Sequence, residues 1–334
     1  MKAAILNGYN KKGCDLVLRD IPVPDINENE LLVRIKTAGV NPLDNMIIRG
    51  EVRMIVPYGF PLVMGNEFVG VVEKVGNNVS RFSPGDRVYG RMPLSKIGGF
   101  AQFAPVNQNA VAKVPEYLTD IEAACIPLTA LTAYQAFELM NPKMGETLFI
   151  SGGTGSLGAM AIPLAKSLGL NVITNGSAAN RDRVLSLGVD RFIDYKTEDY
   201  ADTLANVDYV LDTLGDSELK KEFSILKKGG KLVSLRGMPN AEFAKRAGLS
   251  AFKRMLFALA GGKYDKLASK KNQKYYFLFV HEDGEGLARI SEIFEKLHIS
   301  PSVDEMFDLD DVNKALAKVA RGKSKGKTVI RVNE

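Results

Sequence analysis

The chain has 334 residues, 46% of them hydrophobic and 25% charged, and a formal net charge of +5. This composition is typical of a soluble globular protein, and the length predicts about two domains. No run reaches the roughly 18 apolar residues that cross a bilayer, and the amino-terminal segment is too short and polar for a signal peptide, so we expect a cytoplasmic protein with no membrane partner. The basic excess suits an anionic cofactor or nucleic acid, but solvated surface lysines explain most of it and nucleic acid is not the expected partner.

Cysteine and histidine are scarce. The chain contains Cys14 and Cys125, far apart in sequence, and His281 and His298, both late in the chain. It has neither a C-x-x-C pair nor an H-E-x-x-H pattern, so neither a four-cysteine structural zinc site nor a standard catalytic zinc site is expected. We therefore predict no metal and no disulfide framework.

The first 120 residues read as short strands between turns. The strand-like segments are KAAIL, LLVRIKTAGV, EFVGVVEKVG, DRVYG and GFAQFAPV, and glycine and proline separate them. Short strands punctuated in this way predict an antiparallel, barrel-like domain.

The pattern changes near residue 121. The segment IEAACIPLTALTAYQAFELM predicts a helix that leads into the strand TLFI. The strands NVIT, RFIDY, VDYVLDTLG and GKLVSL then recur between helix-length segments. This alternation predicts a parallel sheet that helices cover on both faces.

Residues 148–158 read LFISGGTGSLG, which places a G-x-G-x-x-G pattern between a predicted strand and a predicted helix. In a dinucleotide-binding turn, Gly153 permits a tight turn, Gly155 lets the backbone approach a pyrophosphate, and Gly158 lets helix and strand pack closely. The helix N-terminus then offers N–H groups and a partial positive charge to the phosphates. We predict dinucleotide binding here; a purely structural turn is the alternative. Pro163 lies inside the following helix and can kink it.

The end of the next strand bears on the choice between NAD and NADP. An acidic residue about 20 positions after the glycine turn binds the ribose 2′-hydroxyl and selects NAD. No carboxylate stands at the end of NVIT, where Ser177, Asn180 and Arg181 follow, and Asp182 is expected to face solvent. Because those three residues supply donors for a 2′-phosphate, we predict NADPH as the cofactor. The alternative is that the arginines here are ordinary surface charges.

The last third of the chain returns to helices and strands. Residues 241–274 predict a basic, amphipathic helical stretch, for which packing over a substrate cleft is favoured over lying on a membrane surface. The strand YYFLFV follows, then helices at GLARISEIFEKL and LDDVNKALAKVA and a final strand, KTVIRV. The Met and Phe residues of 252–258 either line an apolar pocket or belong to the core.

Residues 61–90, PLVMGNEFVGVVEKVGNNVSRFSPGDRVYG, resemble the medium-chain dehydrogenase/reductase superfamily, as do GVNPLDNMIIRGE at 39–51 and IPLAKSLG after the glycine turn. The resemblance covers nearly the whole chain. It implies an α/β protein in which a GroES-like β-barrel substrate domain, residues 1–124 and 280–334, accompanies a Rossmann domain with a doubly wound parallel sheet, residues 125–279. Members are often homodimers joined through their Rossmann sheets, a contact that the apolar strand YYFLFV can serve.

The resemblance also bears on zinc. Zinc alcohol dehydrogenases of this superfamily carry Cys where this chain has Asn41 and His where it has Asn66, and the cysteine-rich structural-zinc lobe is missing. Because an amide is a poor zinc ligand, the chain resembles the zinc-independent quinone oxidoreductase and enone (alkenal/one) reductase branch. Two departures weaken an assignment to quinones in particular: Met46 stands where bacterial quinone reductases have a cleft tyrosine, and Pro163 replaces a glutamine.

Several cofactor contacts follow from the glycine turn and from the resemblance. The predicted contacts are Asn41 and Thr132 near the nicotinamide; Gly153, Thr154, Gly155, Ser156, Leu157 and Gly158 along the pyrophosphate; Ser177, Asn180, Arg181 and Tyr195 at the adenosine 2′-phosphate; and Leu214 along the cofactor.

The chemistry expected of such a site is hydride transfer without a Lewis acid. NADPH supplies the hydride, and the protein orients an α,β-unsaturated carbonyl or a quinone and stabilises the developing enolate. Asn41 and Tyr58 are the candidate catalytic donors to the carbonyl oxygen, although Asn41 can serve only to hold the nicotinamide and Tyr58 only to pack in a loop. For Asp44, Glu67 and Asp86, structural roles such as pairing with Arg49 or Arg87 or capping turns are favoured over catalysis.

We therefore expect an NADPH-dependent oxidoreductase whose substrate is a small, apolar, electrophilic molecule. Two other functions stay open. One is reduction of a carbonyl (aldehyde) to an alcohol, which the missing zinc ligands disfavour. The other is a catalytically idle NADPH-binding protein, such as a sensor, reservoir or nucleic-acid binder, for which the basic stretch 245–275 is the support.

Overall fold

The computed structural model describes residues 1–13, 16–322 and 325–333. Its packing divides the chain into two compact units, Met1–Leu131 with His281–Glu334 and Thr132–Val280, which we call the terminal unit and the central unit. The domains expected from the sequence differ from these units at residues 125–131 and at residue 280.

The terminal unit is built mainly from antiparallel strands. Its strands are β1 (Lys2–Leu6), β2 (Val17–Asp20), β3 (Glu30–Val40), β4 (Leu62–Val63), β5 (Glu67–Val75), β6 (Arg87–Arg91), β7 (Phe103–Asn107), β8 (Val111–Lys113), β15 (Val303–Asp308) and β16 (Lys327–Arg331). One sheet has the order β2-β1-β4; the larger has the order β15-β16-β3-β5-β6-β8, with β7 also paired to β3. Register shifts in the β3–β5 ladder bend the sheet, as barrels require. The predicted antiparallel, barrel-like domain is thereby confirmed.

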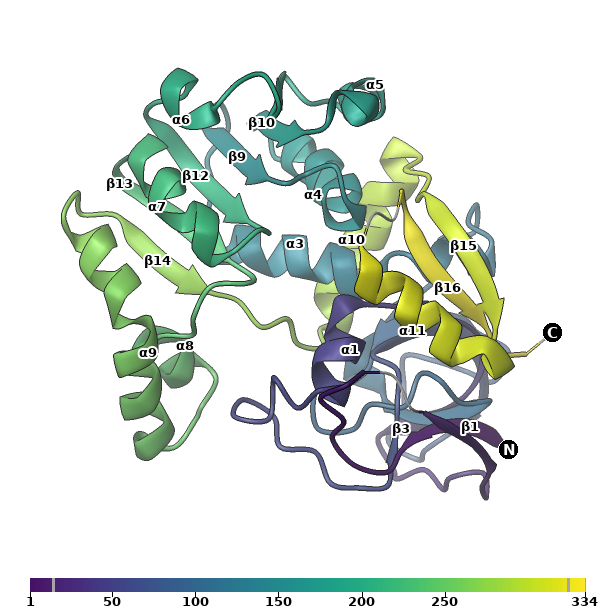
Figure 1. Cartoon of the computed structure of the whole chain (residues 1–334). Helices are drawn as coiled ribbons and strands as arrows, with labels where there is room; N and C mark the ends of the chain where they lie inside the picture. The colour runs from purple at the N-terminus through teal and green to yellow at the C-terminus, as the bar shows by residue number, and fades with distance from the viewer. Residues whose placement is uncertain (14–15, 323–324, 334) are drawn as a thin grey trace. The chain divides into compact units, whose positions relative to one another are not determined.

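Helices complete the terminal unit (Figure 1). They are α1 (Pro42–Ile48), α2 (Asp120–Ala123), α10 (Gly284–Leu297) and α11 (Val312–Arg321), with short 3-10 helices at η1 (Gln108–Ala110) and η3 (Leu309–Asp311). The helices expected at GLARISEIFEKL and LDDVNKALAKVA correspond to α10 and α11. The sequence did not predict α1 or β15, because α1 has only seven residues and β15 (VDEMFD) does not alternate between apolar and polar residues.

The central unit contains a parallel sheet (Figure 1). Its strands are β9 (Thr147–Ser151), β10 (Asn171–Gly176), β11 (Arg191–Asp194), β12 (Val207–Asp212), β13 (Leu226–Ser234) and β14 (Lys274–Phe277), in the order β11-β10-β9-β12-β13-β14. In sequence order of the strands this is 3-2-1-4-5-6, the order of a doubly wound dinucleotide-binding sheet. The α/β fold class with a parallel Rossmann sheet is confirmed.

Helix α3 (Pro127–Met140) crosses the boundary between the two units and precedes β9. The other helices of the central unit follow its strands: α4 (Ser156–Ser167), η2 (Ala178–Asn180), α5 (Arg181–Ser186), α6 (Tyr200–Thr203), α7 (Asp216–Ile225), α8 (Ala241–Arg246) and α9 (Ala251–Ser269). One continuous helix over 121–140 was expected, which is wrong: α2 ends at Ala123 and α3 begins at Pro127, since proline lacks the N–H that helix continuation needs. By contrast, α4 continues through the buried Pro163.

The basic stretch 241–274 forms α8 and α9, which lie side by side next to β14 (Figure 1). On α9, Phe257 is buried, whereas Phe252, Met255 and Leu259 are exposed. The Met and Phe residues of this segment are therefore only in part core residues. Within the described ranges, no helix is long and apolar enough to cross a membrane.

Candidate active site

The glycine turn joins β9 to α4 at the carboxyl end of the parallel sheet. Gly152 has a φ of 68°, and its N–H donates to Oδ1 of Asn175 at 2.7 Å. The N–H of Gly153 donates to Oγ1 of Thr174 at 3.0 Å. The left-handed residue of the turn is thus Gly152, one position before the glycine to which the sequence pattern assigned it. Both turn residues are fixed by side chains at the end of β10.

Gly153, Gly155 and Gly158 have different surroundings. A Cβ on Gly158 would overlap the carbonyl oxygen of Gly153, and a Cβ on Gly153 would overlap Oγ1 of Thr174. A Cβ on Gly155 would instead meet no atom within 4 Å. Gly158 therefore lets α4 approach the turn, while Gly155 leaves space beside the backbone, as close approach of a phosphate needs.

Helix α4 presents its N-terminus at this space. Its N-cap is Gly155, which supplies no side-chain oxygen to the first turn. The N–H groups at the start of a helix have no partner within the helix, and the helix dipole adds a partial positive charge there. Ser156 and Leu157, the first two residues of α4, thus offer N–H groups suited to a pyrophosphate.

The residues predicted to bind the 2′-phosphate gather at the ends of β10 and β11. The parallel register pairs Gly176 with Asp194, and the N–H of Tyr195 donates to the oxygen of Gly176 at 3.2 Å. Ser177 follows Gly176 directly, so Ser177 and Tyr195 leave neighbouring strands at the same edge. Asn180 is the N-cap of α5 and supplies no side-chain cap, and Arg181 is exposed at the start of the same helix.

The other predicted cofactor residues of this unit are close to the turn or buried. Leu214 is exposed after β12, and a Cβ on Gly152 would overlap its side chain, so Leu214 lies against the turn. Arg183 donates from Nη2 to the carbonyl oxygen of Thr154 and thereby holds the turn from α5. Thr132 is buried in α3. The sequence did not single out Arg183 for this role.

In the terminal unit, Asn41 belongs to a buried charged network. Lys327, at the start of β16, donates from Nζ to Oδ1 of Asn41 and pairs with Oε1 of Glu67, each at 2.6 Å. Nδ2 of Asn41 donates to the same Glu67 oxygen at 2.8 Å, and Oε2 of Glu67 accepts the N–H of Leu128 at 2.7 Å. Both ends of the Asn41 amide are thus held by charged neighbours.

Asp44 and Asn66 extend this network. Oδ2 of Asp44 accepts the N–H of Asn41 at 2.7 Å, which closes the first turn of α1, and Oδ1 accepts Nδ2 of Asn66 at 2.7 Å. Burial raises the pKa of Asp44 to about 6, against the lowering effect of these two hydrogen bonds and the nearby ammonium of Lys327. We call Lys327, Glu67, Asn41, Asp44 and Asn66 the Lys327 network.

The Lys327 network does not fit a zinc ion. Asn41 and Asn66 stand where zinc enzymes of the resembled superfamily have ligands, and both amides already bind charged groups of the chain. The ammonium of Lys327 would repel a second cation at Glu67. Burial raises the pKa of Cys125 to about 12, so its thiol is protonated at neutral pH. Cys14 lies outside the described residues.

The acidic residues cap turns and pair with basic side chains, which are structural contacts of the kind expected. Arg49 pairs with Glu51, whereas Asp44 accepts the N–H of Asn41 and Nδ2 of Asn66. Arg87 pairs with Asp120, because α2 lies against the start of β6. Asp86 caps a turn by accepting the N–H of Ser83, as expected, and pairs with Lys113.

Tyr58 and Arg91 are two further buried polar side chains of the terminal unit. Arg91 is the last residue of β6, and the side chain of Tyr58 comes from the segment between α1 and β4. Burial raises the pKa of Tyr58 to about 12, so the phenol is neutral and can donate a hydrogen bond at physiological pH. The sequence analysis did not single out Arg91, because a lone arginine at a strand end carries no motif.

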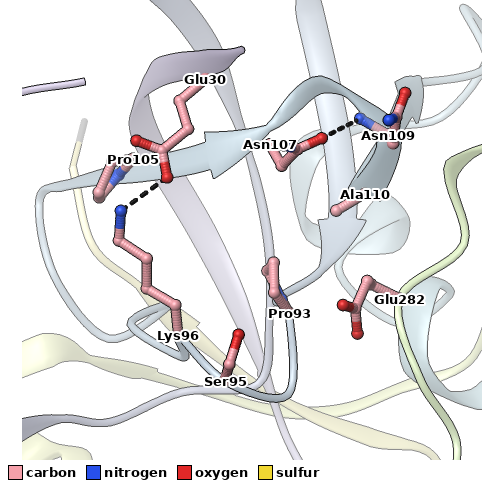
Figure 2. Close-up of a pocket in the computed structure, with 9 residues that line it drawn as sticks. All are labelled: Glu30, Pro93, Ser95, Lys96, Pro105, Asn107, Asn109, Ala110 and Glu282. Atoms are coloured by element: carbon pink, nitrogen blue, oxygen red, sulfur yellow. Dashed lines mark hydrogen bonds and ion pairs between the residues drawn. The ribbon is translucent and has the colours of Figure 1, made fainter. Parts of the chain in front are cut away.

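A pocket of about 300 Å³ lies elsewhere in the terminal unit. Figure 2 shows the residues that line it. Lys96 and Glu30 form an ion pair across one side of it at 2.6 Å. Its other lining residues are Pro93, Ser95, Pro105, Asn107, Asn109, Ala110 and Glu282. The lining contains none of the residues that the sequence predicted for the site.

Two family models match the chain. The model described as alcohol dehydrogenase GroES-like domain matches residues 27–116, and the model described as zinc-binding dehydrogenase matches residues 187–330. The second description concerns the family as a whole; the donor set around Asn41 and Asn66 is the observation that bears on zinc in this chain.

Curated relatives and solved structures extend over the full chain. It is 30% identical to the "NAD(P)H oxidoreductase RTN4IP1, mitochondrial" of Danio rerio, over 100% of this chain and 92% of the relative. It is 28% identical to the "2-methylene-furan-3-one reductase" of Solanum lycopersicum, over 99% of this chain and 79% of the relative. The quinone oxidoreductase from Coxiella burnetii superposes with a TM-score of 0.84 and 26% identity, over 100% of this chain and 99% of that one.

Proposed function

Since this chain belongs to the medium-chain dehydrogenase/reductase superfamily, among its quinone and enone oxidoreductases, we propose that it is an NADPH-dependent reductase that works without zinc. Its substrate is a quinone or an α,β-unsaturated carbonyl compound. The relatives' names support a nicotinamide cofactor and this substrate class; the choice of NADPH and the absence of zinc rest on this chain's own residues.

The observation that carries the proposal is the glycine turn with the strand end beside it. Gly155 and the N-terminus of α4 provide space and N–H groups for a pyrophosphate. At the end of β10, the place of a ribose-binding carboxylate is taken by Asn175, whose Oδ1 is bound to the turn. Ser177, Asn180 and Arg181 follow, and Asp182 is exposed. These groups would bind a 2′-phosphate, whereas a carboxylate would repel it.

The chemistry assigned to this chain is conjugate reduction. A bound nicotinamide supplies the hydride. The alkene would take that hydride at its β-carbon and a proton from water at its α-carbon, so that the double bond would become single and a bound nicotinamide would be oxidised. Tyr58 donates to the carbonyl oxygen as negative charge develops there, and one such donor contributes roughly 3 kcal/mol. Asn41 is the other candidate donor, although Lys327 and Glu67 already hold its amide.

The test is a cofactor oxidation assay with NADPH and NADH separately, against enones, quinones and saturated aldehydes, with and without a chelator. We expect chelator-resistant oxidation of NADPH with enones or quinones. Preference for NADH would contradict the role of Ser177 and Arg181, and loss of activity with the chelator would contradict zinc independence. Binding of NADPH without turnover of any compound would instead favour the idle-binder function.

Two further expectations belong to this proposal. We propose a cytoplasmic location. The Danio rerio relative is named as mitochondrial, so cell fractionation has to distinguish these two locations. We also propose a homodimer joined through the central unit, because β14 is an edge strand of its sheet and an edge can pair with a second copy. Light scattering of the purified protein tests the dimer.

A further inference from the structure

Arg91 is a fully buried arginine whose guanidinium is largely unsatisfied. Its Nη1 donates to the carbonyl oxygen of the adjacent Met92, whereas Nε and Nη2 have no hydrogen-bond partner in the described part of the chain. Nε and Nη2 form the side edge of the guanidinium, the edge that binds a carboxylate through two parallel hydrogen bonds. A buried charge without such a partner is costly, so this edge requires an occupant.

The carboxylates of the surrounding strands do not supply that occupant. The β5–β6 register pairs Arg91 with Glu67, which places their side chains on the same face of the sheet. Glu67, however, binds Lys327, Asn41 and the N–H of Leu128. Asp44 binds Asn66 and the N–H of Asn41. Glu282, whose charge also acts on Arg91, accepts the N–H of Leu94 through Oε2 at 3.1 Å. Among the described residues, none of these carboxylates hydrogen-bonds Nε or Nη2 of Arg91.

Two further polar groups near Arg91 are also unsatisfied. The hydroxyl of Tyr58 and Oδ1 of Asn66 are buried, and neither has a partner among residues 1–13, 16–322 and 325–333. Asn66 is adjacent to Arg91 through the ladder, since its carbonyl oxygen accepts the N–H of Met92 at 2.8 Å. The charge of Arg91 lowers the pKa of Tyr58, against the stronger effect of burial. The two side chains are therefore close enough to interact electrostatically.

We propose that Arg91 binds a carboxylate of the substrate through Nε and Nη2, so that the enzyme acts on α,β-unsaturated carbonyl compounds that also carry a carboxylate group. The inference rests on the proposed function and specifies its substrate class. Arg91 holds the carboxylate, and Tyr58 donates to the carbonyl at the other end of the conjugated system. The charged guanidinium selects the acid over its uncharged ester, because an ester offers no carboxylate to the two donors Nε and Nη2.

The segment that carries Tyr58 contains no helix or strand. Tyr58 lies in residues 49–61, which the structure describes as turns without helix or strand. Most of this segment is exposed, so it can rearrange without breaking a sheet or a helix.

The experiment compares 4-oxo-2-pentenoate with its methyl ester as substrates. In the wild type, we expect a higher kcat/KM for the acid. In Arg91→Gln, the acid-to-ester ratio of kcat/KM should fall by about 10- to 100-fold, because two charge-assisted hydrogen bonds are lost. Arg91→Lys should lie between, since it keeps the charge but not the paired donors. Arg34→Gln removes a partly exposed arginine of β3, paired with Glu73, and should leave the ratio unchanged.

A binding measurement separates this proposal from the proposed function. The saturated acid 4-oxopentanoate cannot be reduced at a double bond, and it should raise the Tm of the wild type and of Arg34→Gln more than its methyl ester does. For Arg91→Gln, the acid should raise the Tm no more than the ester does. For Arg91→Lys, the difference between acid and ester should be smaller than in the wild type. Stabilisation without turnover of any enone would keep the carboxylate site and remove the proposed function. Equal turnover of acid and ester, or an unchanged ratio in Arg91→Gln, would overturn the carboxylate site.

Discussion

The glycine turn of the central unit and the Lys327 network of the terminal unit are both fixed by hydrogen bonds at strand ends, but over very different distances in the chain. In the glycine turn, Gly152 is bonded to Asn175, 23 positions away. In the network, Lys327 is bonded to Asn41, 286 positions away. The first is a local arrangement that repeats wherever a strand, a turn and a helix follow one another. The second exists only after the barrel has closed.

The two regions also differ in what holds them. The glycine turn depends on the absence of side chains, since a Cβ at Gly153 or Gly158 would overlap neighbouring atoms. The Lys327 network depends on charge balance in a site from which water is excluded, where removing one partner leaves the other uncompensated. Substitutions should therefore act mainly through stability in the network and through both stability and cofactor binding in the turn.

The largest effect is expected at Lys327. Lys327→Met should lower the free energy of unfolding by about 4 kcal/mol, because Glu67 then stays buried without its ion-pair partner. Urea denaturation measures this. Lys113→Met removes the exposed lysine that pairs with Asp86 and should cost at most about 1 kcal/mol. Equal costs for the two substitutions would mean that the network is no more sensitive than a surface pair.

Asp44 gives the network a pH dependence. Its pKa is raised from 3.8 to about 6, so the folded state binds the proton more tightly than the unfolded state. Stability from this group is therefore full below pH 3.8 and is lost as the pH rises through about 6, a change of about 3 kcal/mol. The unfolding free energies of wild type and Asp44→Asn are compared from pH 4 to 7.5. Over this range the wild type should lose about 3 kcal/mol relative to the variant. Carboxyl groups with lowered pKa, such as Asp86, cancel in this difference; a flat difference would contradict the prediction.

The sequence could not predict this network, for a physical reason. Asn41 and Asn66 were noticed because they replace expected zinc ligands, and Glu67 because it stands in a motif. Lys327 is one of many lysines near the carboxyl end, and only the pairing of β16 with β3 places it beside Asn41. Arg91 was missed in the same way, since its burial depends on the β5–β6 ladder. Buried charges of this kind follow from tertiary packing, which periodicity does not report.

The central unit was easier to predict because its signals are local. The strands, their parallel order and the glycine spacing all follow from short segments of sequence. The exceptions are also informative. The break at Pro127 and the positive φ of Gly152 depend on one residue each, and the role of Arg183 depends on where α5 packs. Local patterns thus predict the elements of the cofactor site better than the contacts that fix them.

Alanine substitutions at Gly158 and Gly155 should have different effects on stability and on cofactor binding. Gly158→Ala should lower the free energy of unfolding by about 2 kcal/mol, because the new methyl group overlaps the carbonyl oxygen of Gly153. Gly155→Ala should leave stability nearly unchanged, since its Cβ meets no atom within 4 Å, but should weaken NADPH binding by filling the space beside the backbone. Thermal denaturation and cofactor titration measure the two effects. Equal stability of both variants would show that α4 can shift away from the turn. Unchanged NADPH affinity in Gly155→Ala would contradict the prediction that a phosphate binds beside Gly155.

The smallest expected effect concerns cofactor choice at Arg181. Arg181→Gln should lower kcat/KM for NADPH by about tenfold, because one charge-assisted hydrogen bond to the 2′-phosphate is lost from an exposed position. NADH lacks that phosphate, so its kcat/KM should stay within about twofold. Arg191→Gln is the matched control, since Arg191 is also exposed in the central unit but pairs with Glu198. A loss of the same size with both cofactors would mean that Arg181 supports the fold of α5, and no loss with either would mean that it is an ordinary surface charge.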